Sequence, residues 1–431
     1  MFPAADRDRG PAWLGSAWDR AARQDEFPAS AGWEAVAMIE GRAAVRDEGG
    51  RFLALDGWRG VCALLVVCFH APVTGFAETN GLIRNAFLFV DFFFVLSGYV
   101  ITHAFFEPLR EKCEFGRFFL LRLFRVYPLH LAMLALYVAF EAARLAVAGP
   151  GDAFRGGTSL EGLAISLLMA QSFGFLDTLT WNYPSWSISA ELVAYAAFAA
   201  VVVTVPRLIL PLSAVAVVTG IVVIALVRGD MDAASHLGWL RCLAGFSFGV
   251  ILRRAVWRPE AADEAKGQPI AWSLAEIAAV LLVVVFVVRL GGTILSVAAP
   301  LVFGLALYVF THEGGIVSRL LKSRPVAFLG LISYSLYMTH AFVIDRVHNA
   351  ATVVGKVTGI DLFVESTQGR GELIGPQGWE GSLVLVVIVA GTIVFSWITY
   401  RLVEKPGMAL GRRLLARGGT AARPGSARAA A

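Results

Sequence analysis

The sequence predicts an all-α polytopic integral membrane protein, a helix bundle of about ten transmembrane helices plus a re-entrant or interfacial segment. Hydrophobic residues make up 57% of the chain and charged residues only 16%, whereas soluble domains carry about a quarter charged residues. The apolar residues recur in blocks of roughly the 20 residues that a helix needs to cross the hydrocarbon core of a bilayer. Lys and Arg gather between some of these blocks, as at the cytosolic ends of spanning helices.

One membrane domain, expected over residues 51–410, lies between two polar extensions. Residues 1–50 mix charged side chains with Gly, Ala and Pro, and residues 411–431 are equally poor in side chains that could pack. Both extensions are expected to be mobile and cytosolic. The chain does not open with a basic stretch leading into an apolar one, so no cleavable signal peptide is expected and the first span should direct insertion.

Ten apolar segments are the expected spans, in chain order. They lie at 53–75, 84–106, 117–147, 184–205, 207–227, 237–253, 272–290, 293–311, 325–347 and 382–403. A further apolar segment, 160–176, is shorter and is interrupted by Ser, Gln and Gly. No internal repeat is visible in the sequence.

Four groups of basic residues predict the orientation of these spans, because short cytosolic loops are enriched in Lys and Arg. They are Arg110, Lys112 and Arg117; Arg253, Arg254, Arg258 and Lys266; Arg319, Lys322 and Arg324; and Lys405, Arg412 and Arg413. With all four in the cytosol, span 117–147 runs outward and span 184–205 runs inward. Both statements hold only if 160–176 does not cross, which gives ten spans with both termini in the cytosol.

Arg59 and His70 are candidate functional residues of the first span, because charged groups inside spans usually face the bundle interior. They are eleven positions apart, which is almost three helical turns, so they share one face about 16 Å apart along the axis. The near-neutral pKa of a histidine suits acid/base chemistry. An equally good interpretation is that His70 hydrogen-bonds a neighbouring helix and Arg59 pairs with Asp56.

Arg122 and Arg125 lie one turn apart at the expected cytosolic entrance of the third span. Guanidinium groups bind phosphate in a bidentate manner, which suits an anionic donor such as a coenzyme A nucleotide. The alternative is that both arginines are only basic anchors at the membrane edge.

Two further polar patterns lie at the starts of later spans. Ser187 and Glu191 share a helix face, where the carboxylate could orient an imidazole or hold a sugar hydroxyl, or where the pair could simply cap the helix. Ser333, Tyr337 and His340 form another polar stripe. His340 is therefore a candidate acid/base or binding residue, and interhelical hydrogen bonding explains it equally well.

The sequence lacks the motifs that are typical of several functional classes. The chain has no Gly-x-Ser-x-Gly elbow, no His-Glu-x-x-His zinc motif and no P-loop. Its four cysteines lack the spacing of a zinc site or a disulfide framework, so no metal is expected. The sequence shows no pattern of basic and aromatic residues that would predict nucleic acid binding.

In their order and spacing, six segments resemble the membrane acyltransferase family 3 of bacterial integral-membrane O-acyltransferases. They are LDGWRGVCALLVVCFH, VDFFFVLSGYVI, RLFRVYPLH, WSISAELVAY, ISYSLYMTH and the closing EKP, and the resemblance covers about residues 51–406. It implies that Arg59, His70, Arg122 and Arg125 are functional, with Glu191 and Ser187 as further site residues. We take His70, Glu191 and Arg59 as catalytic, Arg122 and Arg125 as donor-binding, and Ser187, Trp186, Tyr337 and His340 as substrate-binding candidates.

The resemblance implies transfer of an acyl group, acetyl in the first instance, from cytosolic acyl-CoA to a hydroxyl of a cell-surface polysaccharide, lipid-linked sugar or similar acceptor. His70 would act as a general base or as a transient acyl carrier. The protein would lie in a bacterial inner membrane. Some relatives carry an extracytoplasmic hydrolase-like domain, whereas only about twenty residues follow the expected membrane domain here. We therefore expect this chain to act alone or with a separate extracytoplasmic partner. The alternative function is a transporter or flippase for a lipid-linked sugar, for which paired halves with broken helices would be typical.

Overall fold

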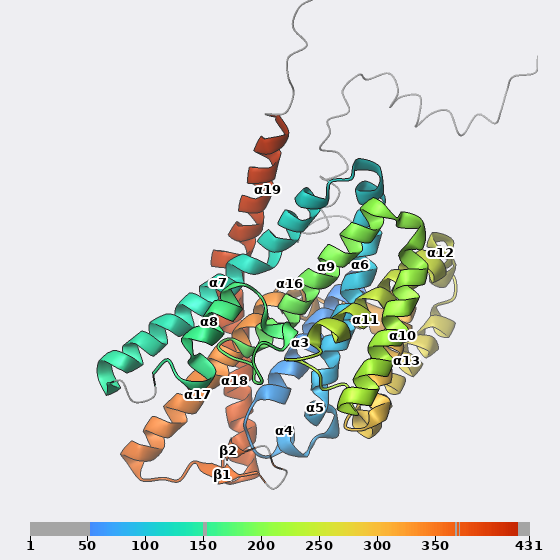
Figure 1. Ribbon diagram of the computed structural model, residues 1–431. Coiled ribbons are helices and arrows are strands. Elements are labelled where there is room, and N and C mark those ends of the chain that lie inside the picture. Colours follow the sequence, from blue (N-terminus) through green and yellow to red (C-terminus); the bar gives the residue numbers. More distant parts are fainter. Residues whose placement is uncertain (1–51, 150–152, 367–368, 370, 421–431) are drawn as a thin grey trace, which may run out of the picture. The chain divides into compact units, whose positions relative to one another are not determined.

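The computed structural model describes residues 52–149, 153–366, 369 and 371–420. The predicted N-terminal extension, residues 1–50, lies outside the described residues. The described chain is a bundle of helices with a single small β-hairpin (Figure 1). The predicted all-α polytopic fold is therefore confirmed.

Within the described residues, seven helical stretches are long and apolar enough to cross a membrane. They are Leu53–His70 (α3), Ala86–Lys112 (η1 and α6), Phe115–Val147 (in α7, Phe115–Ala148), Tyr183–Thr204 (η4 and α9), Pro206–Arg228 (η5 and α10), Pro269–Leu290 (α13), and Gly378–Ala416 (α18, η8 and α19). Helices α16 (Arg324–Leu331) and α17 (Ser333–Thr358) form an eighth if their 71° bend lies within one span.

The other two expected spans are helical but shorter. Segment 237–253 corresponds to α11 (Gly238–Ile251) and a π-helical turn, η6 (Leu252–Val256). Segment 293–311 corresponds to η7 (Ile294–Ala298) and α14 (Ala299–Phe310). All ten predicted segments are thus helices, but the count of ten spans is not confirmed, because only seven or eight meet the length and hydropathy of a crossing helix.

Segment 160–176 forms only α8 (Leu160–Leu167) and one 3₁₀ turn, η3 (Gln171–Phe173). Eight helical residues rise about 12 Å, which is too short to cross the hydrocarbon core. Ser166 and Ser172 are fully buried, and His130 Nε2 lies 2.8 Å from the Ser166 carbonyl oxygen. Irregular backbone at membrane depth is tolerated where it is buried in protein, which fits the predicted non-crossing segment.

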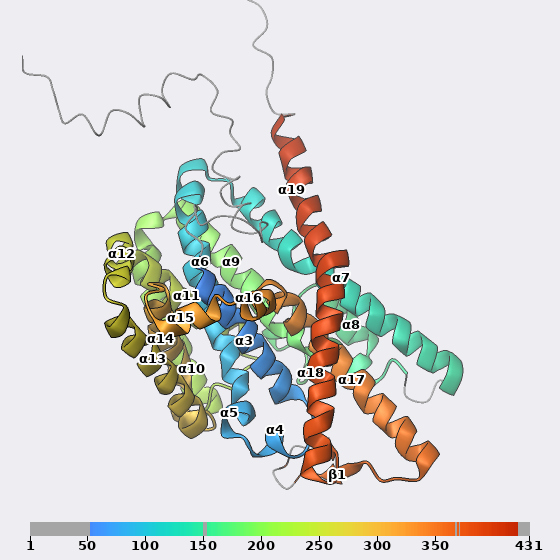
Figure 2. The same ribbon diagram turned by 180° about the vertical axis from the view of Figure 1, so that it is seen from behind.

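Helix α3 runs through the interior of the bundle and packs against α6, α16 and α17 (Figures 1 and 2). Its contact with α16 brings the two backbones together: a Cβ atom at Gly60 would lie 2.6 Å from the Gly330 nitrogen. Helices α6 and α11 cross equally closely, since a Cβ atom at Gly98 would lie 1.9 Å from the Phe246 carbonyl oxygen. Small residues at such crossings are typical of membrane helices. These contacts fix the height of α3 and of its polar residues.

The chain that follows α3 is held by the hairpin of β1 (Phe363–Glu365) and β2 (Glu372–Ile374). The two strands are antiparallel, with Val364 opposite Leu373. The backbone just after His70 pairs with β2. Ile374 N donates to the Pro72 carbonyl oxygen at 2.8 Å, and Thr74 N donates to the Ile374 carbonyl oxygen at 3.2 Å. Short helices α4 (Phe76–Thr79) and α5 (Gly81–Arg84) complete this end of the bundle.

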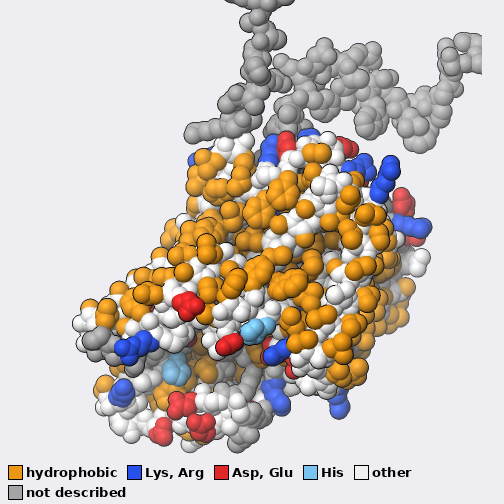
Figure 3. Space-filling model, viewed as in Figure 1, with side chains coloured by type: hydrophobic (Ala, Val, Ile, Leu, Met, Phe, Trp, Pro, Cys, Tyr) orange, Lys and Arg blue, Asp and Glu red, His pale blue; other side chains and the backbone are white. Residues whose placement is uncertain are grey.

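Charged side chains gather towards the two ends of the bundle, with a hydrophobic band between them (Figure 3). The turn between α6 and α7, helix α12 (Pro259–Lys266) and helix α19 (Lys405–Thr420) lie at the same end (Figures 1 and 2). Together with η6 and Arg258, which directly precede α12, they carry three of the four basic groups, in line with a shared side of the membrane. The predicted disordered tail needs correction, because α19 continues past residue 411 to Thr420, and only 421–431 lie outside the described residues.

We expect residues 149–183 to begin and end on the outer side of the membrane. Arg155→Cys and Thr178→Cys, both at exposed positions, should react with a membrane-impermeant thiol reagent added to intact cells in a Cys113→Ser background. Native Cys113, which is exposed between α6 and α7, is the control and should react only after the cells are opened. Labelling of the two new cysteines from opposite faces would require 160–176 to cross.

Candidate active site

The structure brings together three rings at the end of α3: His70, His340 of α17, and Tyr183 of η4 (Tyr183–Ser185). His70 Nδ1 lies 3.2 Å from His340 Nε2, and the two ring centres are 4.9 Å apart. The Tyr183 ring centre is 5.0 Å from that of His70 and 6.0 Å from that of His340. His340 is fully buried, whereas His70 is partly exposed. The predicted catalytic histidine therefore sits against a second histidine.

The hydrogen bonds of the two rings fix which nitrogens carry protons. His340 Nδ1 lies 2.7 Å from the Tyr337 carbonyl oxygen, which can only accept, so this nitrogen carries a hydrogen. In a neutral ring, His340 Nε2 is then an acceptor that faces His70 Nδ1. His70 Nδ1 also lies 3.0 Å from the Val66 carbonyl oxygen, so it is the protonated nitrogen. His70 Nε2 is left as the nitrogen that can take up a proton.

Two predicted substrate-binding residues, Ser187 and Tyr337, lie beside the histidine pair. Ser187 Oγ is 2.8 Å from the Tyr337 hydroxyl and 3.1 Å from the Pro184 carbonyl oxygen. Both side chains are buried. The hydrogen bond between Ser187 and the Tyr337 hydroxyl joins α9 (Trp186–Thr204) directly to α17, and the carbonyl oxygen of Tyr337 accepts from His340.

Trp186 lies apart from this group. Its side chain is 7% exposed, it packs edge-on against Phe94, and the Arg241 guanidinium carbon lies 5.5 Å from its ring centre. The structure therefore places Trp186 in the packing between α9, α6 and α11, and not with Ser187 and Tyr337.

Sequence reasoning missed the polar residues that anchor the loop before α9. Asn182 is fully buried and its side-chain nitrogen donates to the carbonyl oxygen of Met338, two residues before His340, at 2.9 Å. Gln171 Nε2 donates to Ser185 Oγ at 2.9 Å. These bonds place Tyr183 against His70. The signal was the run of Asn, Tyr, Pro and Ser between two apolar segments, where buried polar groups need partners.

A second polar group lies further along the bundle, around Arg122 and Arg125 of α7. Arg125 Nη1 donates to Glu404 Oε1 at 2.6 Å, and Ser335 Oγ donates to Glu404 Oε2 at 2.6 Å. Arg122 hydrogen-bonds Tyr195, and its guanidinium carbon lies 4.7 Å from the Phe105 ring centre. Glu404, which sequence analysis noted only within the closing EKP, is thus a member of this group.

Arg59 and Glu191 connect the two polar groups. Arg59 Nη1 lies 3.6 Å from Asp56 Oδ1, and the charges of Arg125, Glu404 and Glu191 also act on it. Glu191 hydrogen-bonds Tyr195, and its charge also acts on Tyr337. The prediction that Glu191 orients His70 stays a prediction, because the described contacts place Glu191 between the arginines and Tyr337.

The group around the arginines is balanced in charge. Three guanidinium groups, those of Arg59, Arg122 and Arg125, act on one another and on the three carboxylates of Asp56, Glu191 and Glu404. An anion would therefore bind here through directed N–H groups and not through an excess of positive charge.

Sequence reasoning also missed a buried ion pair between Asp91 of α6 and Arg241 of α11. Arg241 Nε donates to Asp91 Oδ1 at 3.0 Å and Arg241 Nη2 donates to Asp91 Oδ2 at 2.7 Å, with both side chains at most 1% exposed. Single opposite charges in two apolar segments were the available signal. This pair joins α6 to α11 below Trp186.

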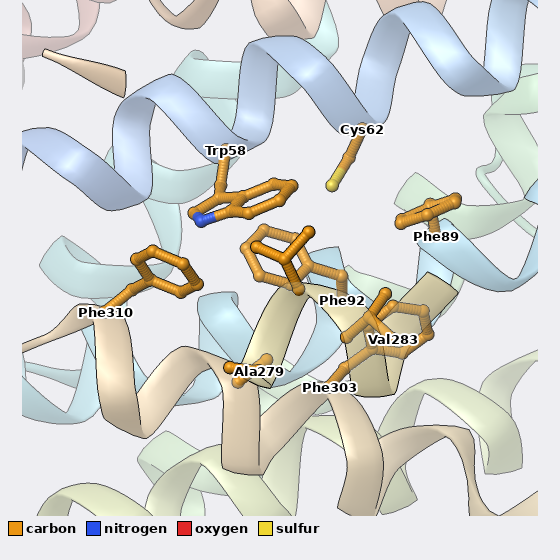
Figure 4. Close-up of a pocket in the computed structure, with 10 residues that line it drawn as sticks. Trp58, Cys62, Phe89, Phe92, Ala279, Val283, Phe303 and Phe310 are labelled. Carbon is orange, nitrogen blue, oxygen red and sulfur yellow. The ribbon is translucent and has the colours of Figure 1, made fainter. Parts of the chain in front are cut away.

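An apolar pocket lies between α3, α6, α13 and α14, and Arg59 is not among its lining residues (Figure 4). Trp58 and Cys62 of α3 line it together with aromatic side chains of α6 and α14 and with Ala279 and Val283 of α13. Apart from the indole N–H of Trp58, which has no partner, the labelled lining side chains offer hydrocarbon and one thiol. This pocket provides neither an acid/base group nor a site for phosphate.

Comparisons with known proteins give a consistent family. The model of the family Acyl_transf_3, described as "Acyltransferase domain", matches residues 52–401. "Acyltransferase MdmB" of Streptomyces mycarofaciens is 26% identical over 406 residues, covering 84% of this chain and 93% of that protein. "Protein 2 in picA locus" of Rhizobium radiobacter is 33% identical over 159 residues, covering 35% of this chain and 81% of that protein.

A third relative, BcsY of Komagataeibacter xylinus, described as a membrane-bound transacylase, is 30% identical over 169 residues. The match covers 37% of this chain and 38% of that protein. No solved structure matches the chain.

Breaking the Asp91–Arg241 pair should destabilise the fold. Arg241→Met leaves a buried carboxylate without its partner, at an expected cost of about 3–5 kcal/mol in the free energy of unfolding. The double variant Asp91→Asn/Arg241→Met removes both charges and should regain part of that loss. Thermal unfolding of the purified protein in detergent measures both effects. Glu107→Gln, which breaks a half-exposed ion pair with Arg110, is the control and should lower the free energy of unfolding by about 1 kcal/mol or less. An equally small effect of Arg241→Met would contradict a structural role of the Asp91–Arg241 pair.

Proposed function

The chain belongs to the Acyl_transf_3 family of acyltransferases, and on that premise we propose that it transfers an acyl group from cytosolic acyl-CoA to a carbohydrate-type hydroxyl. The protein is a multi-pass membrane enzyme, an O-acyltransferase. Acetyl is the proposed acyl group, and a cell-surface polysaccharide or a lipid-linked sugar is the proposed acceptor. Membership of an acyltransferase family favours this function over the transporter or flippase alternative.

One observation carries the proposal: polar side chains follow α3 from Arg59 to His70 through the bundle. The two residues are about 16 Å apart along the helix axis. The charges of Arg125, Glu404 and Glu191 act on Arg59, and those of Arg125 and Glu191 also act on Arg122. Tyr183, His340 and Tyr337 surround the His70 end. A donor whose phosphates are held at the Arg59 end can therefore extend its thioester to an acceptor held at the His70 end.

Arg122 and Arg125 are the proposed contacts of the donor phosphates. Both are at least partly buried, and the Arg125 side chain is 20% exposed, so part of its guanidinium is open to a ligand. Because the surrounding carboxylates balance the positive charge, phosphate binding would depend on the direction of the N–H groups. The pantetheine arm would then extend along α3 and carry the thioester towards His70.

At the His70 end, the proposed reaction uses His70 Nε2 as a general base. It takes the proton of the acceptor hydroxyl while the hydroxyl oxygen attacks the thioester carbonyl carbon. The carbon–sulfur bond breaks as the oxygen–carbon ester bond forms, and the imidazolium returns its proton to the departing thiolate. His340 accepts a hydrogen bond from His70 Nδ1 and keeps the ring in the required tautomer. Attack by Nε2 itself, with a transient acyl-imidazole, uses the same atom and is the alternative route.

The proposed location is the bacterial inner membrane with both termini in the cytosol. The three relatives come from bacteria. The arginine group then lies nearer the cytosolic side and the histidine pair nearer the outer side, where polysaccharide or lipid-linked sugar is available. A separate extracytoplasmic protein could receive the product or present the acceptor there.

Loss of both donor-binding arginines should weaken the binding of acetyl-CoA. Each real charge-assisted contact to phosphate contributes about 1.5–3 kcal/mol, so Arg122→Ala/Arg125→Ala, which removes two such contacts, should raise the dissociation constant at least about 100-fold. Equilibrium binding of radiolabelled acetyl-CoA to the purified protein in lipid nanodiscs measures this. Arg110→Ala removes one arginine from a half-exposed position and is the control. An unchanged constant in the double variant would leave both arginines as membrane-edge anchors.

His70→Ala should leave the protein inserted and able to bind acetyl-CoA, yet lower acyl transfer at least about 100-fold, the usual effect of a positioned acid/base group. His70→Gln should fare no better, because an amide cannot take up the proton. The readout is the acyl mass on surface glycans and small secreted metabolites, compared between a deletion strain and the same strain carrying each variant.

If His70 only satisfied a neighbouring helix, glutamine would supply similar hydrogen bonds at a cost of about 1 kcal/mol or less. A His70→Gln strain with normal acylation would therefore refute the catalytic role of His70. His340 would then be the candidate acid/base residue. A deletion strain that loses no acyl mass from glycans would refute the proposed class of acceptor.

A further inference from the structure

A π-helical turn, η8 (Tyr400–Glu404), interrupts the long helix formed by α18 and α19. Such turns are rare and frequently occur at functional sites. The extra residue shifts every following side chain by about 100° around the helix axis relative to an uninterrupted α-helix. The turn ends at Glu404, which is 1% exposed.

The turn directs Glu404 towards α7 and α17. One carboxylate oxygen accepts from Arg125 Nη1 and the other from Ser335 Oγ, each at 2.6 Å. The next turn continues this contact, since Met408 Sδ lies 2.9 Å from Arg125 Nη1 and a Cβ atom at Gly407 would lie 2.8 Å from Pro128. Both oxygens of the buried carboxylate are thus used.

Arg125 is hydrogen-bonded through one nitrogen, and its guanidinium carbon lies 5.8 Å from the Tyr334 ring centre. Its described hydrogen bonds use Nη1, and its side chain remains 20% exposed, whereas that of Glu404 is fully buried. The planar guanidinium has five donors in a fixed arrangement, so a bond at one nitrogen orients all the others. Ser335 in turn orients the carboxylate.

We propose that Glu404 is a positioning residue of the donor site, which holds the Arg125 guanidinium so that its open edge faces the phosphates of the acyl donor. The inference rests on the proposed function, in which Arg125 binds acyl-CoA. The π-helical turn is the local structure that brings Glu404 to this place.

A purely structural role is the competing explanation. Glu404 joins three helices, and a buried carboxylate that loses its partner is costly whatever Arg125 does. The two explanations differ in how Glu404 and Arg125 combine. If Glu404 acts on the donor through Arg125, its loss should have no further effect on donor binding once Arg125 is gone.

The test is a double-variant cycle on the binding of radiolabelled acetyl-CoA to the full chain in nanodiscs, with Glu404→Gln, Arg125→Ala and both together. Glu404→Gln keeps the shape but loses the charge, and it should weaken binding about threefold or more. In the Arg125→Ala background the same change should alter binding less than about twofold. Glu276→Gln, which removes another fully buried carboxylate that accepts bonds from Gly315 and Ser318, is the matched control and should leave binding unchanged.

Equal effects of Glu404→Gln in both backgrounds would overturn the inference and leave Glu404 as a structural link. If Arg125→Ala binds acetyl-CoA normally, the proposed donor role of Arg125 fails, and the inference fails with it. If Glu404→Gln does not accumulate in the membrane, Ser335→Ala is the second variant. It keeps the ion pair but releases one carboxylate oxygen, and its weaker effect on binding should likewise vanish without Arg125.

Discussion

A charged side chain inside the bundle is costly unless it finds a partner in the protein, because the hydrocarbon core of a bilayer offers no water. The structure meets this constraint by pairing residues of helices that are distant in the sequence. Asp91 binds Arg241, and Arg125 binds Glu404. Hydrogen bonds tolerate little change in length, so each pair fixes the relative height of two helices. Glycine contacts such as Gly60 with Gly330 set how closely the helices approach, and the polar pairs set their register.

The relation between Arg59 and His70 was predictable because both lie on one uninterrupted helix, where sequence spacing gives face and height directly. The ten apolar segments were predictable for a similar reason, since hydropathy depends on composition alone. Which helices meet is a property of tertiary packing. Ser187, Tyr337 and His340 were therefore identified as separate candidates, and only the structure shows that they lie together beside His70.

Other features were missed because hydropathy averages over many residues. The bend between α16 and α17 and the π-helical turn η8 change the direction or the phase of a helix without changing its apolar character. Trp186 was predicted to bind substrate, as was its neighbour Ser187. Neighbouring helix residues point about 100° apart, however, and the structure directs Trp186 to the Asp91–Arg241 pair. The spacing rule that related Arg59 to His70 explains why Trp186 and Ser187 have different neighbours, and the substrate-binding role of Trp186 stays a prediction.

Breaks in regular structure coincide with the polar groups, and a physical reason connects the two. A continuous helix satisfies its own backbone and presents side chains only sideways, whereas a break can turn a polar group into the bundle. Tyr183 follows the non-crossing segment, His340 follows the bend before α17, and Glu404 ends η8. Each break therefore contributes one side chain to the line between the arginines and the histidine pair. Near Arg59, the guanidinium of Arg125 and the carboxylates of Asp56, Glu191 and Glu404 all act on its charge, so the arginines do not form an isolated cluster of positive charge. A neutral thioester and a neutral hydroxyl could then meet beside His70 while the charged phosphates of the donor stay with the arginines.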